Sequence, residues 1–186
     1  MKYAACLIAG CAALAACNSS PKVNEKNASV AEVAQKVQEA GTDQSFIRAG
    51  KWQSKVTIDK FEVPGMPADV AQRMQGVMAQ QQAHSFESCV TQEDVKRPKA
   101  DFFTGKNNEC QYDHFTMGGG KIDALMHCPG KGGSGETTMQ MAGTYSPESY
   151  QMQMATKVEP GAGGHGGVNM EMRVDSHRVG ECSSNG

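Results

Sequence analysis

Methionine is the residue type whose number and spacing in this chain could do chemistry. The sequence contains 12 methionines, and several of those between Cys110 and Cys182 recur at every second position. A thioether sulfur is a soft ligand that suits Cu(I), so a row of methionines could form a copper site. Methionine is also an adaptable core residue, and Met-X-Met in a strand places two core residues on one face. The spacing therefore favours core packing and keeps Cu(I) binding as the alternative.

No other set of side chains suggests catalysis or a resident cofactor. The five histidines occur without the His-X-His or His-Glu-X-X-His spacing of a metal site. We expect His114 on the apolar face of a sheet and His127 on the polar face, so the two would not converge. Gly132-Gly-Ser134-Gly does not have the spacing of a nucleophile elbow. We therefore expect no enzyme, no catalytic residue, no cofactor and no dedicated metal site.

The first 16 residues are typical of a secretory leader. Lys2 precedes an apolar run that is too short to span a bilayer as a helix. The tetrapeptide Leu14-Ala15-Ala16-Cys17 resembles the lipobox of bacterial lipoproteins, and this resemblance implies cleavage before Cys17 and its lipidation. Asn18 follows in place of aspartate, which by similarity to sorted lipoproteins favours the outer membrane, facing the periplasm. We expect an exported protein that is lipid-anchored in the cell envelope.

The cysteines agree with an oxidising compartment. Of the seven, Cys6 and Cys11 would leave with the leader and Cys17 would carry lipid. Four then remain, an even number that favours two disulfides. They are Cys89, Cys110, Cys128 and Cys182. A hairpin folded about Gly119 sets Cys110 opposite Cys128, which by elimination pairs Cys89 with Cys182. No Cys-X-X-Cys motif occurs, so a redox enzyme or a zinc ribbon is not expected.

The elements that position these residues are strands. Apolar side chains alternate with polar ones from residue 110 to residue 175, which predicts an antiparallel meander with one apolar and one polar face. The apolar set is Tyr112, His114, Thr116, Ile122, Ala124, Met126, Met139, Met141, Tyr145, Tyr150, Met152, Met154, Val168, Met170, Met172 and Val174. The polar set includes Gln111, Asp113, Gln140, Thr144, Gln151, Gln153, Asn169, Glu171, Arg173 and Asp175.

Turn residues predict the register of this meander. The reversal about Gly119 sets Tyr112 against Met126, and the turn Ser146-Pro-Glu-Ser149 pairs Tyr145 with Tyr150. A return through the glycine-rich stretch 160–167 sets Met154 beside Met172. The predicted result is one row of methionines across four strands: Met126, Met141, Met154 and Met172.

Two helices and an earlier strand precede the meander. Ser29 and Glu32 form a capping-box pattern before a valine stripe, and Gly41 ends it. A strand opens at Trp52 and changes phase near Asp59 or Lys60, which predicts a bulge. A helix then follows Pro67 to about Gln82. We expect it to cover the apolar face and to form, with the sheet, an apolar ligand pocket lined by Met74, Met78, Met141, Tyr145 and Met154.

The chain divides into four segments: a leader (1–16), a lipidated tether with a short helix (17–45), a β-rich domain (46–182) and a tail (183–186). The fold class is mainly β (α+β), with a curled antiparallel sheet of about seven strands and one covering amphipathic helix, stapled by disulfides. Several short motifs occur in the β-rich segment in a characteristic order. They are Gly50-Lys-Trp52, Met66-Pro67, Ser88-Cys-Val-Thr91, Cys110, Cys128, Gly143-Thr-Tyr145 and Gly180-Glu-Cys182. Together they resemble an exported bacterial family labelled domain of unknown function 3617, which implies no activity.

These observations favour a non-enzymatic envelope lipoprotein, structural or binding an apolar ligand on the concave face of its sheet. A periplasmic Cu(I)-binding protein is the alternative. The net charge is −2 and there is no long basic block, so nucleic acid is not an expected partner. The expected partners are the membrane, through the N-terminal lipid, and an apolar small molecule.

Overall fold

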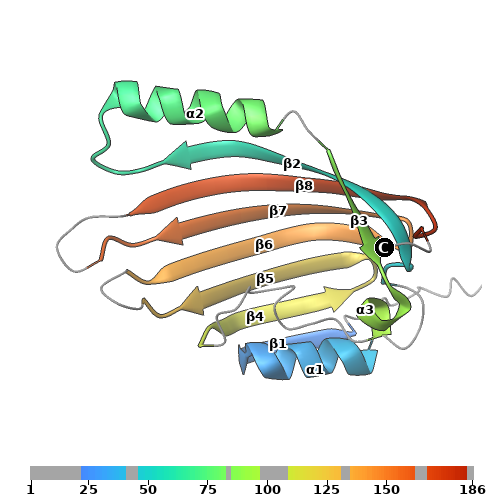
Figure 1. Ribbon diagram of the computed structural model, residues 1–186. Coiled ribbons are helices and arrows are strands. Elements are labelled where there is room, and N and C mark those ends of the chain that lie inside the picture. The colour runs from blue at the N-terminus through green and yellow to red at the C-terminus, as the bar shows by residue number, and fades with distance from the viewer. Residues whose placement is uncertain are drawn as a thin grey trace, which may run out of the picture.

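A computed structural model describes residues 22–40, 46–82, 85–96, 109–130, 135–161 and 167–183. Its core is one antiparallel sheet of eight strands in the order β1-β4-β5-β6-β7-β8-β2-β3 (Figure 1). The strands are β1 (Val23–Ser29), β2 (Gly50–Glu62), β3 (Phe86–Val90), β4 (Gln111–Gly118), β5 (Lys121–Cys128), β6 (Thr137–Ser146), β7 (Ser149–Val158) and β8 (Val168–Gly180). The helices are α1 (Val30–Ala40), α2 (Ala68–Gln82) and α3 (Gln92–Lys96). The predicted fold class is confirmed, with eight strands in place of about seven.

The sheet has an apolar face, which we call the inner face, and a polar face, which we call the outer face. Cross-strand neighbours on the inner face form a continuous row through the sheet. The row consists of Phe115, Ala124, Met141, Met154, Met172 and Ile58. The predicted pairings of Met141 with Met154 and of Met154 with Met172 are therefore confirmed. Met126 lies one pair away, opposite Met139, so its predicted place in the row is wrong.

A bulge in the β4–β5 hairpin explains a second wrong prediction. The turn of this hairpin is formed by Gly119 and Gly120, both with positive φ. The register then slips at Asp113, between the pairs Tyr112–Met126 and His114–Leu125. A bulge of this kind reverses the alternation on one strand. Phe115 and Met117 therefore join Tyr112 in the core. His114 and Thr116, predicted on the inner face, lie on the outer face instead.

The predicted bulge in β2 and the predicted turn at Ser146–Ser149 are confirmed, whereas most of the predicted glycine-rich return 160–167 lies outside the described residues. The register between β2 and β8 shifts between Ile58 and Lys60. At the β6–β7 turn Ser146 pairs with Ser149, and the Ser149 backbone N–H donates to Ser146 Oγ over 3.0 Å. Ser54 and Ser176 are buried on the inner face, and their hydroxyls lie 2.7 Å apart.

Residues 23–40 belong to the fold. The sequence predicted a polar tether up to Lys26 and left open whether the short helix after Ser29 packs on the sheet or lies loosely in the tether. Val23–Ser29 pairs with β4 as the edge strand β1. The predicted capping box is confirmed, because the Glu32 N–H donates to Ser29 Oγ over 3.2 Å and the Ser29 N–H donates to Glu32 Oε2 over 2.7 Å. The valine side of α1 enters the same buried cluster as Tyr112 and Phe115. This helix therefore covers part of the inner face.

The helix after Pro67 has a different position from the predicted one. It begins at Ala68, as expected, with Val70 and Ala71 donating to the Pro67 carbonyl. Figure 1 shows α2 beside β2, at the opposite edge of the sheet from α1. There it runs along the part of β2 that β3, which pairs only with Gly50–Ser54, leaves uncovered. Covering a strand edge with a helix protects its free backbone groups. In the described part of the chain, no helix is long and apolar enough to cross a membrane.

Two disulfides staple the sheet in the predicted pairing. Cys110 and Cys128 join the start of β4 to the end of β5, with their Cα atoms 4.1 Å apart. Cys89 and Cys182 join β3 to the segment after β8, with their Cα atoms 5.6 Å apart.

Candidate functional site

An apolar cavity of about 190 Å³ lies on the inner face, where Phe46 and Ile47 pass over the sheet before β2 begins. Its walls come from β5, β6, β7 and β8 in addition to that segment. The residues that line it are Phe46, Ile47, Ile122, Met141, Tyr145, Tyr150, Met152, Met154 and Val174.

The structure brings together three of the five predicted ligand-binding residues. Met141, Tyr145 and Met154 line the cavity. Met74 and Met78 do not, because they lie on α2, which packs beside β2 and not across the inner face. Strand alternation also placed Ile122, Tyr150, Met152 and Val174 on the apolar face, although they were not among the predicted ligand-binding residues. The contribution of Phe46 and Ile47 had no signal in the sequence, because these residues lie outside any periodic segment.

Aromatic contacts hold the walls of the cavity. The rings of Phe46 and Tyr145 meet edge to face with their centroids 5.0 Å apart. Tyr150 packs on the buried Trp52 with a centroid distance of 5.7 Å. Trp52 in turn donates its indole N–H to the Arg48 carbonyl over 3.0 Å. Edge-to-face and tilted ring pairs of this kind stabilise a fixed geometry. The aromatic contacts therefore fix the positions of the side chains that line the cavity, and these side chains are almost entirely apolar.

The methionine row beside the cavity is the place where a soft metal could bind. Met141, Met154 and Met172 are direct cross-strand neighbours on β6, β7 and β8. Directly opposed residues of antiparallel strands have Cβ atoms about 4.5–5.5 Å apart. Three thioethers can therefore converge there. Among the described residues, no group of three or more His, Cys, Asp or Glu side chains is placed to hold a metal ion.

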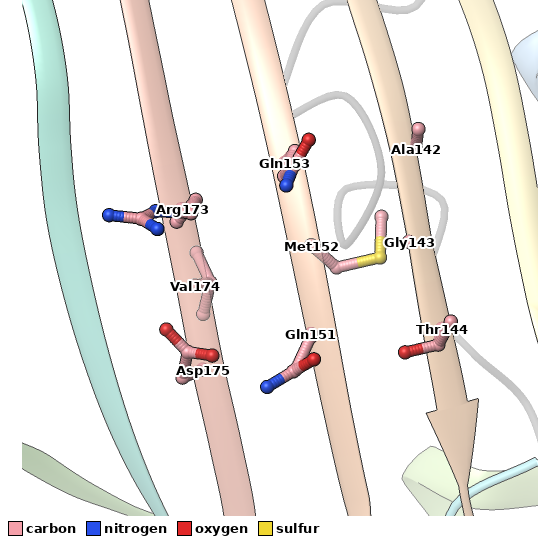
Figure 2. Close-up of a pocket in the computed structure, with 9 residues that line it drawn as sticks. All are labelled: Ala142, Gly143, Thr144, Gln151, Met152, Gln153, Arg173, Val174 and Asp175. Carbon is pink, nitrogen blue, oxygen red and sulfur yellow. The ribbon is translucent and has the colours of Figure 1, made fainter.

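The outer face carries shallow polar depressions over β6, β7 and β8. Figure 2 shows one of them, of about 400 Å³, with Gln151, Gln153, Arg173 and Asp175 on neighbouring strands. Met152 and Val174 also border it, but their side chains alternate with the polar ones and line the apolar cavity on the inner face.

Two histidines of the outer face are paired with carboxylates. His114 Nε2 lies 2.7 Å from Asp123 Oδ1. His127 lies between two acids, with Nε2 at 2.9 Å from Asp113 and Nδ1 at 2.9 Å from Glu136. All of these groups are substantially exposed, so the pairs contribute little to stability. Because both ring nitrogens of His127 face carboxylates, this group does not have the arrangement of a base beside a nucleophile.

Several of the sequence motifs have a structural explanation. A side chain at Gly50, whose φ is 144°, would place its Cβ 2.4 Å from the Gly180 carbonyl and from Arg178 Nε. Arg178 Nε donates to the Ala49 carbonyl over 2.8 Å, which ties the start of β2 to β8. A Cβ at Gly143 would lie 2.2 Å from the Gln151 carbonyl. These glycines permit close approach of strands, so they report on the fold and not on chemistry.

Comparison with known proteins agrees with the resemblance that the motifs indicated. No curated protein and no solved structure matches the chain. Residues 47–182, well over half of the chain, match the model of a family described as Protein of unknown function (DUF3617). The chain belongs to this family.

Proposed function

We propose that the protein is a lipid-anchored, non-enzymatic component of the cell envelope that holds a small apolar group in the inner-face cavity. The observation that carries the proposal is the cavity itself, whose nine lining residues are apolar or aromatic. A preformed apolar space with fixed walls binds apolar groups without a large ordering cost.

The size of the cavity limits what it can hold. Pockets for drug-sized ligands measure roughly 300–1,000 Å³. An apolar cavity of about 150 Å³ is large enough to bind benzene. At about 190 Å³, the cavity here suits one ring or a short stretch of an alkyl chain. The ligand would therefore be a small apolar molecule, or the apolar end of a larger one.

Binding can be tested by titrating the oxidised protein with benzene while the methionine methyl groups are observed by NMR. We expect shifts of the Met141, Met152 and Met154 methyl signals that saturate. Val174→Phe fills the cavity and should abolish saturation, whereas Val168→Phe, on the same strand but outside the cavity, should leave it unchanged. Equal binding by the Val174→Phe protein, or no saturable shift in the wild type, would rule out the cavity as a binding site.

The proposed anchor is a lipid on Cys17. The sequence support is the leader followed by Leu14-Ala15-Ala16-Cys17. Cys17 precedes the first residue of β1, Val23, by six positions, a length of chain that can reach at most about 20 Å. Labelling of cells with radioactive palmitate should mark the wild-type protein and not Cys17→Ala. Label on both proteins, or on neither, would contradict the anchor.

A second candidate function is Cu(I) binding by Met141, Met154 and Met172. The in-register placement of these three residues on adjacent strands is the observation in its favour. Titration of the oxidised protein with Cu(I) against a competing chelator tests it. Met154→Leu keeps the volume but removes a thioether and should weaken binding, while Met117→Leu, in the buried core on β4, serves as the control. Affinity no tighter than micromolar would end this candidate.

A further inference from the structure

The outer face carries one continuous groove, which we call the outer-face groove. Three depressions of about 400, 420 and 540 Å³ adjoin over β6, β7 and β8. The first shares Ala142, Gln153 and Arg173 with the second, and Thr144, Gln151 and Asp175 with the third. From Gln140 to Ser146, six residue steps at the rise of a strand correspond to about 20 Å. Each depression alone has the volume of a ligand site, in contrast to the smaller apolar cavity.

Hydrogen-bonding side chains border the groove and are available to a ligand. Within the described ranges, Gln140, Thr144, Gln151, Gln153 and Asp175 make no side-chain hydrogen bond or ion pair. Figure 2 shows the amides of Gln151 and Gln153 on β7 between the polar side chains of β6 and β8. A glutamine amide both donates and accepts hydrogen bonds. The groove therefore offers donors and acceptors at regular strand spacing.

Small residues form the floor of the groove. Ala142 on β6 and Ala155 on β7 point to the same face as Gln153, which lies opposite Ala142 and two positions before Ala155. Their short side chains leave the space that the longer glutamines border. A ligand can therefore lie against the sheet and still reach the amides on both sides.

The charges and apolar groups of the groove exclude several ligand classes. Its one arginine, Arg173, donates to Asp59 over 2.8 Å, and Glu171 and Asp175 add negative charge. Polyanions such as nucleic acid need a basic surface. Apart from the imidazole of His177, the outer-face side chains of the groove include no ring and no large aliphatic group, and protein partners depend on such anchors. A ligand that matches this surface carries no negative charge and is rich in hydroxyl or amide groups.

From this complementarity we infer that the outer-face groove binds a neutral oligosaccharide, laid along β7 and held by Gln151, Gln153 and Thr144. This site lies on the opposite face of the sheet from the apolar cavity, so it is independent of the proposed function. An extended sugar chain presents hydroxyl groups along its whole length, which suits a groove of about 20 Å.

The test is a titration of the oxidised full-length protein with two neutral tetrasaccharides, one N-acetylated (chitotetraose) and one not (maltotetraose). The side-chain amide signals of Gln151 and Gln153 are followed by NMR. We expect saturable shifts with at least one sugar. The double variant Gln151→Ala/Gln153→Ala should weaken binding at least tenfold. Gln111→Ala, which removes an exposed glutamine from the same face on β4, is the matched control and should bind as the wild type does.

Preference for chitotetraose would assign the amides to an acetamido group, and equal binding would assign them to ring hydroxyls. No saturable shift with either sugar up to 10 mM, a concentration far above that of a weak specific site, would overturn the inference. Saturation by an extended acidic or neutral tetrapeptide and not by either sugar would overturn it as well. Circular dichroism of each variant shows whether the sheet is intact.

Discussion

The inner face of the sheet has two halves that are built alike and covered differently. Over β4 and β5, α1 seals the face, and residues such as Tyr112, Phe115 and Met126 are at most 1% exposed. Over β7 and β8, methionines of the same alternating pattern remain half-buried, although Trp52 and Ser54 on the neighbouring strand β2 are buried. We call these the sealed half and the open half. The cavity lies at their boundary, where Ile122 and Met141 of the sealed half meet Met152 and Met154 of the open half.

The comparison shows that an alternating pattern defines which face of a strand is apolar but not what covers it. Cover depends on where a helix can be placed by its connection. Helix α1 follows β1 directly, since Ser29 ends the strand and Val30 begins the helix, so it folds back over the neighbouring strands. Helix α2 follows the long strand β2 and packs along its edge. The part of the inner face between the two helices is covered only by the segment at Phe46 and Ile47, among the described residues.

The largest expected effect comes from removing the disulfides, one in each half. Cys89 and Cys182 are 93 residues apart, whereas Cys110 and Cys128 are 18 apart. Loop-closure entropy then predicts a loss of about 4.6 kcal/mol for Cys89→Ala/Cys182→Ala and about 3 kcal/mol for Cys110→Ala/Cys128→Ala. Urea denaturation measures both. A greater loss for the second pair would mean that packing in the sealed half outweighs loop closure.

A matched pair of methionine truncations tests the two halves directly. Met126→Ala removes a side chain that is 1% exposed in the sealed half, and we expect a loss of about 2–5 kcal/mol. Met172→Ala makes the same change at a half-buried site in the open half, where water already reaches the side chain. We expect a loss of about 1 kcal/mol there. Equal losses in chemical denaturation would show that the open half is as well packed as the sealed half.

Features of the sheet that depend on local sequence could be predicted, whereas others could not. The meander, both disulfides and the pairing of Met154 with Met141 and Met172 could be predicted from alternation and turn residues. A period of two and a tight turn are local properties of the sequence. The bulge at Asp113 was not predictable, since the residues on either side continue an acceptable alternation. It exchanges His114 and Thr116 for Phe115 and Met117 in the core. The bulge near Asp59 was predictable only because Phe61 and Val63 resume visibly out of phase.

The sites were partly predictable for a related reason. Met141, Tyr145 and Met154 line the cavity because they belong to the inner face, which the pattern identified. Met74 and Met78 do not, because the packing of α2 depends on a long-range choice between the face of the sheet and the edge of β2. The strand β1 has a mostly polar sequence, with only Val23 and Ala28 buried. An edge strand of that composition has no periodic signal.

Tyr112 provides a pH-dependent test of burial in the sealed half. Its hydroxyl is buried and, among the described residues, has no hydrogen-bond partner, and burial raises its pKa to about 12. Since the ordinary value is about 10, the unfolded chain loses this proton first as the pH rises. The wild type should therefore lose about 2–3 kcal/mol of stability between pH 10 and pH 12 through this group.

The Tyr112→Phe protein lacks the ionisable hydroxyl and should not show that part of the loss. Below pH 10 it should be as stable as the wild type or slightly more stable, because an unpaired buried hydroxyl is removed. The measurement is the difference in unfolding free energy between the two proteins from pH 8 to pH 12. A constant difference over that range would mean that the hydroxyl reaches water in the folded protein.

The smallest expected effect compares two helix caps. Ser29 caps α1, which seals the inner face, and Thr91 caps α3 through the same reciprocal bonds, with the Asp94 N–H donating to Thr91 Oγ1 over 3.1 Å. Loss of a capping side chain costs about 1 kcal/mol when the helix is part of the cooperative fold. We expect that cost for Ser29→Ala. Thr91→Ala should cost clearly less, because α3 has only five residues and none of its described side chains, those of residues 92–95, is buried. Thermal unfolding of both variants measures the difference. The buried valines of α1 predict the larger shift for Ser29→Ala. Equal shifts would mean that α1 is no more important to the sealed half than a short surface helix.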